Sequence, residues 1–256
     1  MTEKAPPACA ICLTADRQQL TDRAVQCFLA QTYKNSHLLI YDTGNKPYRL
    51  ERLASSRITI VCDGHEMAGP IGALRNRANA LVPPGTEILL HMDSDDWSGP
   101  YRIQDQVQSL IDSGKECVGY RIVLFWRTRS TEPDLRPIWD REPQAWGYHN
   151  IQPAYCIGAS FCYWRRVWER HKFREDLPGS ERGMGEDKEW LNHVDSHGYR
   201  SHVSAPNMGS DHSPLLVCEI HGGNTMTYSL EDESRGPTGW KREPSWDAKL
   251  QSVMAL

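Results

Sequence analysis

The stretch Leu89-Leu90-His91-Met92-Asp93-Ser94-Asp95-Asp96-Trp97 places three carboxylates directly after an apolar run. Such a run predicts a buried strand, which would deliver the following residues to an open edge of its sheet. Because side chains alternate along an extended segment, we expect Asp93 and Asp95 on one face, where both can bind one divalent cation. Mg²⁺ and Mn²⁺ prefer such oxygen ligands and often share them with substrate phosphates. An ordinary polar turn is the alternative that this stretch alone leaves open.

Length and charge narrow the class of protein. The chain has 256 residues, enough for one large domain or two fused halves with a substantial core. Its formal charge is -4, from 29 basic and 33 acidic residues, so binding to nucleic acid is not favoured. Residues 1–7 have no apolar signal core, and no run approaches the ~18 apolar residues of a membrane-spanning helix. We therefore expect a soluble, cytoplasmic protein without an integral membrane segment.

The eight cysteines are scattered, mostly within apolar runs, which is typical of reduced structural thiols. We predict no disulfide framework. Cys9 and Cys12 form a C-x-x-C pair, but it falls inside the first predicted strand, where positions three apart face opposite sides. The pair is therefore not expected to chelate zinc.

The first half of the chain alternates between predicted strands and helices. The strands are expected at 8–13, 37–41, 58–62 and 88–92, and the helices at 19–31, 71–81 and 100–112. This order predicts an α/β fold with a mainly parallel, doubly wound sheet, in which ligands bind beyond the carboxyl ends of the strands. Thr14, Asp42, Asp63 and the Asp93 cluster all fall at such ends.

The second half is less regular. Further strands are expected at 120–126 and 215–220, helical segments at 165–171 and after Gly185, and an irregular surface excursion at 128–147. Residues 231–256 are polar with few aliphatic side chains, so we expect a peripheral C-terminal tail.

The order of these features resembles a family of enzymes. The residues that carry the resemblance are Thr14, Asp42, Gly72-Ala73-Leu74-Arg75-Asn76, Met92-Asp93-Ser94-Asp95-Asp96, Gly158-Ala159-Ser160-Phe161-Cys162-Tyr163-Trp164-Arg165-Arg166, Gly185-Glu186-Asp187 and His221-Gly222-Gly223-Asn224-Thr225. Together they resemble a family 2 glycosyltransferase of the nucleotide-diphospho-sugar transferase superfamily. The resemblance implies a GT-A fold, a Rossmann-like, mainly parallel central sheet flanked by helices in a single compact domain. It also implies a nucleotide-sugar-binding half at 1–120 and an acceptor-binding, catalytic half at 121–230.

The resemblance implies a metal and nucleotide site. Asp95 would bind Mn²⁺ or Mg²⁺ directly, Asp93 would contact both the ribose and the metal, and His221 would complete the coordination. His212 competes with His221 for that role. Thr14, Asp42 and Arg75 would hold the nucleobase side, and the ionised carboxylate of Asp42 can accept an imide N–H.

The resemblance also implies a catalytic pair. Asp187 would be the general base of an inverting transfer, because an alcohol attacks poorly until its proton is removed. Glu186 would orient the acceptor. A helix-capping role is the alternative for both carboxylates.

The implied reaction is metal-dependent transfer of a sugar from a nucleotide diphosphate sugar, with a UDP-sugar favoured, to a carbohydrate or other hydroxyl acceptor. The alternatives are a non-catalytic sugar-nucleotide or carbohydrate-binding module and a nucleotidyltransferase. The last should carry a glycine-rich loop after its first strand, and residues 13–17 contain no glycine. Five aromatic residues can form either a sugar platform or core packing: Trp126, Trp139, Trp146, Tyr148 and Trp164.

Overall fold

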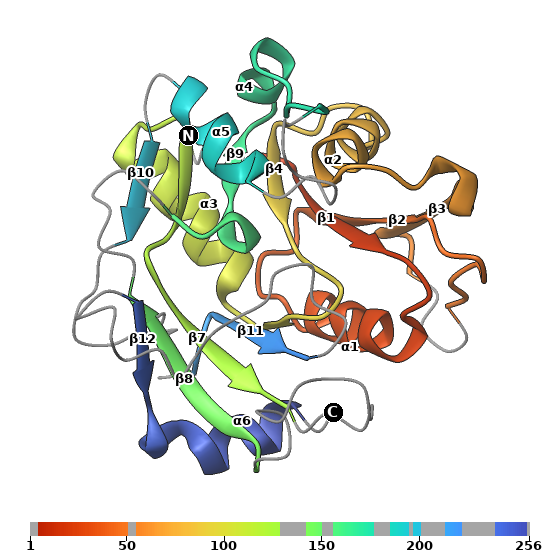
Figure 1. The fold of residues 1–256 in the computed structure, drawn as a ribbon. Coiled ribbons are helices and arrows are strands. Elements are labelled where there is room, and N and C mark those ends of the chain that lie inside the picture. The colour runs from red at the N-terminus through yellow and green to blue at the C-terminus, as the bar shows by residue number, and fades with distance from the viewer. Residues whose placement is uncertain are drawn as a thin grey trace.

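Two β-sheets with helices packed on their faces make up the protein (Figure 1). The computed structural model describes residues 5–50, 55–128, 142–149, 156–176, 185–194, 197–200, 213–221 and 239–254. The central sheet has the strand order β10-β6-β9-β4-β1-β2-β3. Its strands are β1 Ala8–Thr14, β2 Ser36–Asp42, β3 Ile58–Cys62, β4 Ile88–His91, β6 Cys117–Tyr120, β9 Cys162–Trp164 and β10 His197–Arg200.

Strands β1 to β4 pair in parallel, and β9 runs antiparallel between β4 and β6. The mainly parallel sheet and the four strands predicted in the first half are therefore confirmed, each within about one residue. The apolar runs form these strands because both faces of the sheet are covered, which buries every position of β1 but one.

The faces of this sheet are covered by α1 Gln18–Leu29, α2 Ile71–Ala80, α3 Arg102–Ser113, α4 Arg165–Arg170 and α5 Glu186–His193. The last helix, α6 Asp247–Met254, packs beside α1 and against the second sheet of the protein. Figure 1 shows α1 and α2 on opposite sides of β1 to β3. Ala10 and Cys12 of β1 belong to a core cluster that includes side chains of α1, α3 and α6, whereas Cys9 and Ile11 belong to a cluster with side chains of α2, α4 and α5. Alternation along β1 thus separates Cys9 from Cys12, as predicted.

A second sheet has the order β12-β8-β7-β11-β5. Its strands are β5 Trp97–Ser98, β7 Ile122–Arg127, β8 Gln144–His149, β11 Leu216–Ile220 and β12 Gly239–Arg242. The strand predicted at 120–126 is confirmed as β7, but its start differs, because Tyr120 ends β6. The chain leaves the central sheet at Tyr120 and enters the second sheet at Ile122, so β6 and β7 pair with different neighbours. Part of the predicted irregular excursion is the regular strand β8, and residues 129–141 lie outside the described residues.

The expectation of a peripheral tail from 231 onward differs from the structure over residues 239–254. Strand β12 pairs with β8, and Leu250 of α6 is fully buried in the core beside α1. Leu250, Val253 and Met254 recur at helical spacing, so a few apolar side chains suffice to bury one face of α6.

None of the helices in the described parts of the chain combines the length and apolar character needed to cross a membrane. All eight cysteines are free thiols.

Candidate active site

A cavity of about 380 Å³ opens at the carboxyl ends of β1 and β4. Its wall includes six of the predicted site residues: Thr14, Arg75, Asp93, Asp95, Glu186 and Asp187. They come from the end of β1, from α2, from the turn after β4 and from the start of α5. Residues far apart in the sequence therefore converge at the edge of the sheet where ligands of such folds bind.

The segment that carries Asp93 and Asp95 is a turn, not an extended strand. β4 ends at His91, and the amide of Asp96 donates to the carbonyl of Asp93 at 3.3 Å. The argument from strand alternation was therefore wrong. Both carboxylates line the cavity but pair differently, since Asp93 Oδ1 lies 3.5 Å from Arg75 Nη2, whereas Asp95 Oδ2 accepts from Arg17 Nη1 at 2.8 Å.

Asp95 and His221 lie together. His221 Nε2 is 3.2 Å from Asp95 Oδ2, although 126 residues separate them in sequence. Burial would raise the pKa of Asp95, but the hydrogen bond from His221 and the charge of Arg17 outweigh it and hold this pKa below its usual value. Asp95 is thus an anion at neutral pH.

These two side chains fit a divalent cation that takes its remaining ligands from phosphate and water. Among the residues that the structure describes, no three His, Cys, Asp or Glu side chains stand close enough to hold an ion on their own. His212, the competing ligand, and residues 222–225 lie outside the described residues.

Asp96 ties the turn to the second sheet. Its two oxygens accept from the amide of Glu219 at 3.1 Å and from Cys218 Sγ at 3.3 Å. Burial, followed by the charges of Asp95 and Asp93, raises the pKa of Asp96 well above its usual value. β11, which ends one residue before His221, is thereby fixed against the turn that carries Asp95.

Arg75 lies between two carboxylates. Its Nε is 3.5 Å from Glu186 Oε1 and its Nη2 contacts Asp93, so this predicted nucleobase residue occupies the middle of the cavity wall. The side chain is only 6% exposed, and its Nη1 has no hydrogen-bond partner among the described residues. Burial raises the pKa of Glu186, and Arg75 partly opposes this effect. The unpartnered Nη1 is a donor for a ligand oxygen.

Asp187 stands in the first turn of α5, against the backbone of Gly158. A Cβ atom at Gly158 would lie 2.4 Å from Asp187 Oδ2, so only glycine leaves room for this carboxylate. Asp187 Oδ1 accepts from the amide of Lys188 at 2.7 Å, and its position in the first turn of α5 is one that the helix dipole favours for an anion. A role at the helix start therefore accounts for Oδ1 of Asp187, whereas Oδ2 lies against Gly158.

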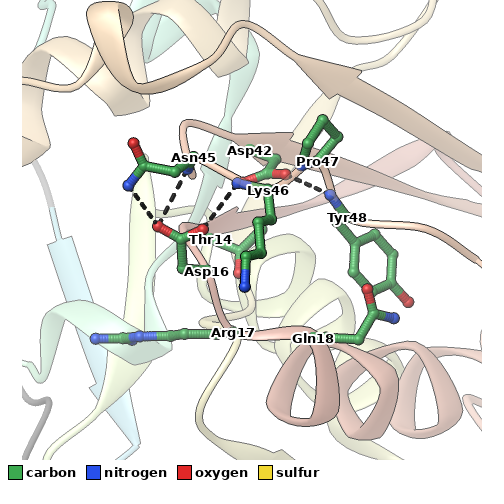
Figure 2. Close-up of a pocket in the computed structure, with 9 residues that line it drawn as sticks. All are labelled: Thr14, Asp16, Arg17, Gln18, Asp42, Asn45, Lys46, Pro47 and Tyr48. Atoms are coloured by element: carbon green, nitrogen blue, oxygen red, sulfur yellow. Dashed lines mark hydrogen bonds between the residues drawn. The ribbon is translucent and has the colours of Figure 1, made fainter.

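A second pocket, of about 490 Å³, adjoins the first and shares Thr14 and Arg17 with it (Figure 2). Asp42 is 1% exposed here, and its two oxygens accept from the amides of Gly44 at 2.8 Å and Tyr48 at 2.6 Å. Figure 2 shows both Asp42 and Asp16 bonded to the loop at 44–48. Asp42 thus organises the loop that forms this pocket.

Sequence reasoning did not single out Asp16, Arg17, Lys46 and Tyr48 as pocket residues. Asp16 has a positive φ of 55°, a conformation that Asp adopts more readily than most residues. Its carboxylate accepts from Asn45 and from the amide of Lys46 at 2.9 Å. The sequence feature that could have indicated a pocket here is the turn that follows the first predicted strand, which contains Asp16 and Arg17.

The five aromatic residues do not share one platform. Trp126 is buried in the core around α1, whereas Trp146 and Tyr148 pack with Trp240 in the second sheet. Trp164 lies in β9, and Trp139 falls outside the described residues. The aromatic side chain in the cavity wall is Phe125, which sequence reasoning passed over.

Comparison with known proteins identifies the fold. No protein-family profile and no curated protein matches the chain. Solved structures of S. aureus TarS match it at 11–13% identity: TarS itself (TM-score 0.53, 83% of this chain, 36% of that chain), residues 1–349 with UDP (0.53, 83% and 60%) and residues 1–349 with UDP-GlcNAc (0.52, 88% and 62%).

The fold is that of the GT-A glycosyltransferases. The predicted fold class is thereby confirmed. The chain spans a little over a third of TarS and about three fifths of its 1–349 fragment. At this level of identity the likeness extends to the fold and not to a particular family.

Proposed function

We propose that the chain is a metal-dependent, family 2-like glycosyltransferase that moves a sugar from a nucleotide diphosphate sugar to a hydroxyl acceptor. The observation that carries the proposal is the convergence of Asp95, Arg75 and Asp187 around one cavity at the carboxyl edge of the sheet, with His221 in contact with Asp95. A cation-binding pair, a buried cationic donor and a carboxylate base are the groups that such a transfer requires.

The two adjoining cavities suit the two ends of a nucleotide diphosphate. We assign the base and ribose to the pocket beside Asp16 and Tyr48, and the diphosphate to the cavity at Arg75 and Asp95. Arg17 lines both pockets and, like Arg75, offers positive charge to phosphate oxygens. The TarS fragment has been solved with UDP and with UDP-GlcNAc, which favours a UDP-sugar as the donor.

We assign the metal, Mn²⁺ or Mg²⁺, to Asp95 and His221, with phosphate and water as its other ligands. Asp93, the third predicted ligand, is paired with Arg75 and would contact the metal only when the donor is bound. When bound, the metal would neutralise the charge that grows on the diphosphate as the glycosidic bond breaks. The protein's own part is to hold Asp95 ionised and to fix β11 through Asp96.

Asp187 acts as general base in this proposal. It takes the proton of the acceptor hydroxyl as that oxygen bonds to the anomeric carbon, and the electrons of the broken carbon–oxygen bond leave with the diphosphate. Attack opposite the leaving group inverts the anomeric configuration. Glu186 orients the acceptor, which is a carbohydrate or another hydroxyl compound bound by the half of the chain at 121–230, while 1–120 binds the donor.

Two measurements test the proposal. Titration calorimetry with UDP and GDP, each with and without Mn²⁺, should show Mn²⁺-dependent binding of UDP. Hydrolysis of a panel of sugar nucleotides should then release nucleotide diphosphate from one of them. Binding without turnover of any donor would favour a non-catalytic module. Pyrophosphate formed from UTP and a sugar phosphate would favour a nucleotidyltransferase.

A further inference from the structure

A buried arginine outside the cavity links two segments that carry site residues. Arg102, at the start of α3, is 1% exposed. Its Nη1 donates to Ser98 Oγ at 2.6 Å and its Nε to Gln106 Oε1 at 3.2 Å. Its Nη2 donates to the carbonyls of His91 at 2.6 Å and Ala159 at 2.5 Å. All four acceptors are uncharged, so in the part of the chain that the structure describes this buried cation is held by hydrogen bonds and not by a counter-ion.

The two carbonyls on Nη2 belong to two segments that carry different parts of the site. His91 ends β4, two residues before Asp93, whereas Ala159 lies in the 3₁₀ turn Gly158–Ser160. A planar guanidinium presents its N–H groups in fixed directions. Because Nη2 of Arg102 donates to both carbonyls, it sets the distance between the end of β4 and the turn Gly158–Ser160.

Other hydrogen bonds also hold the turn Gly158–Ser160 in place. His91 Nδ1 lies 2.7 Å from the carbonyl of Gly158, and His91 Nε2 lies 3.3 Å from Tyr163 Oη, which accepts from Asn79. Ser160 Oγ accepts from the amide of Tyr120 at 2.7 Å. β4, β6, β9 and α3 therefore all fix this turn.

Asp187 rests directly on the turn. The 2.4 Å approach of Asp187 Oδ2 to the position of a Cβ at Gly158 means that a small movement of the turn would displace the carboxylate. Ile157, Gly158 and Ala159 also line the cavity beside Asp187.

We propose that Arg102 is a positioning residue, which fixes the Asp187 carboxylate relative to Asp93 and Asp95 through the turn Gly158–Ser160. The inference rests on the proposed function and adds to it the residue that joins the donor wall to the base. Arg102 touches neither the cavity nor the reacting atoms.

Three variants test this inference by turnover and binding. Gly158→Ala pushes Asp187 aside directly, and Arg102→Lys keeps the charge but cannot reach the same acceptors. Both should lower kcat for donor hydrolysis by about 100-fold, the cost of a displacement near 1 Å. Their affinity for UDP should stay that of the parent. Gly69→Ala is the matched control, because a Cβ there meets nothing within 4 Å.

A thermodynamic cycle gives a readout that does not depend on activity. The loss of stability from Gly158→Ala should shrink when Asp187 is replaced by glycine, and this coupling should weaken in the Arg102→Lys background. Additive losses, or a parental kcat in both Gly158→Ala and Arg102→Lys, would overturn the inference while leaving the transferase proposal intact. If the parent neither binds UDP nor cleaves any donor, the transferase proposal fails, and the cycle alone decides whether Arg102 positions Asp187.

Discussion

The aspartates of this protein divide into those that line the cavity and those that build its frame. Asp93, Asp95 and Asp187 border the main cavity, whereas both oxygens of Asp42 are engaged by backbone amides. Sequence alone does not separate the two groups, because a strand-end aspartate has the same local pattern in either role. The distinction depends on whether the following loop folds back onto the carboxylate.

Replacement of Asp42 tests its role as a frame residue. Asp42→Asn puts an N–H₂ group against one of two backbone amides and leaves a buried donor unpaired. We expect a loss of about 1–3 kcal/mol of unfolding free energy. Urea denaturation measures it, with exposed Asp112→Asn as the control. An unchanged unfolding midpoint together with lost UDP affinity would instead assign Asp42 to direct recognition of the base.

Replacement of Asp187 tests the general base. Asp187→Asn keeps the shape of the side chain but removes the proton acceptor, so kcat for donor turnover should fall by about 10²- to 10⁴-fold. UDP affinity, measured by calorimetry, should be retained. Full turnover by the variant would refute the assignment.

Helix α6 contributes to the hydrophobic core, although its sequence predicted a peripheral tail. Its Leu250 is fully buried beside α1. Leu250→Ala should therefore cost about 2–5 kcal/mol in unfolding free energy. Leu81→Ala is the control, because Leu81 is 46% exposed. Equal urea midpoints for the two variants would show that α6 is peripheral.

We expect the contact between α6 and β8 to depend on pH. Asp247 Oδ1 accepts from the amide of Ala145 at 2.8 Å and from Arg242 at 2.9 Å. Burial would raise the pKa of Asp247, but these hydrogen bonds outweigh it, so the folded pKa lies below the usual value of about 3.9. The stabilisation is thus fully present above that value and is lost as the pH falls through the lower folded pKa.

Urea titrations from pH 7 to pH 3 check this linkage. The parent should be more stable than Asp247→Asn at pH 7, and the gap should close toward pH 3. A gap that stays constant with pH would contradict the role of the ionised carboxylate.

For the molecule as a whole, the local pattern of apolar residues and turn residues predicted the strands and helices of the first half of the chain. It also predicted the edge of the sheet at which the site forms. Burial on both faces makes β1, β2 and β4 almost continuous apolar runs, and β3 at the edge of the sheet is a half-buried apolar run, so the signal for each strand is local. The division of residues 117–127 between two sheets was not predictable, because it depends on pairing with β8, β9, β10 and β11, which lie far along the chain. The contacts of Asp95 with His221 and of Asp96 with Glu219 are nonlocal in the same way.

The central claim is that the cavity holds a nucleotide diphosphate sugar with a divalent cation at Asp95. The most direct test is calorimetric titration of UDP into the parent and into Asp95→Asn, each with Mn²⁺ and with EDTA. Our account predicts that Mn²⁺ strengthens UDP binding to the parent and that this gain is lost in Asp95→Asn. UDP affinity that is the same with Mn²⁺ and with EDTA in the parent would contradict it.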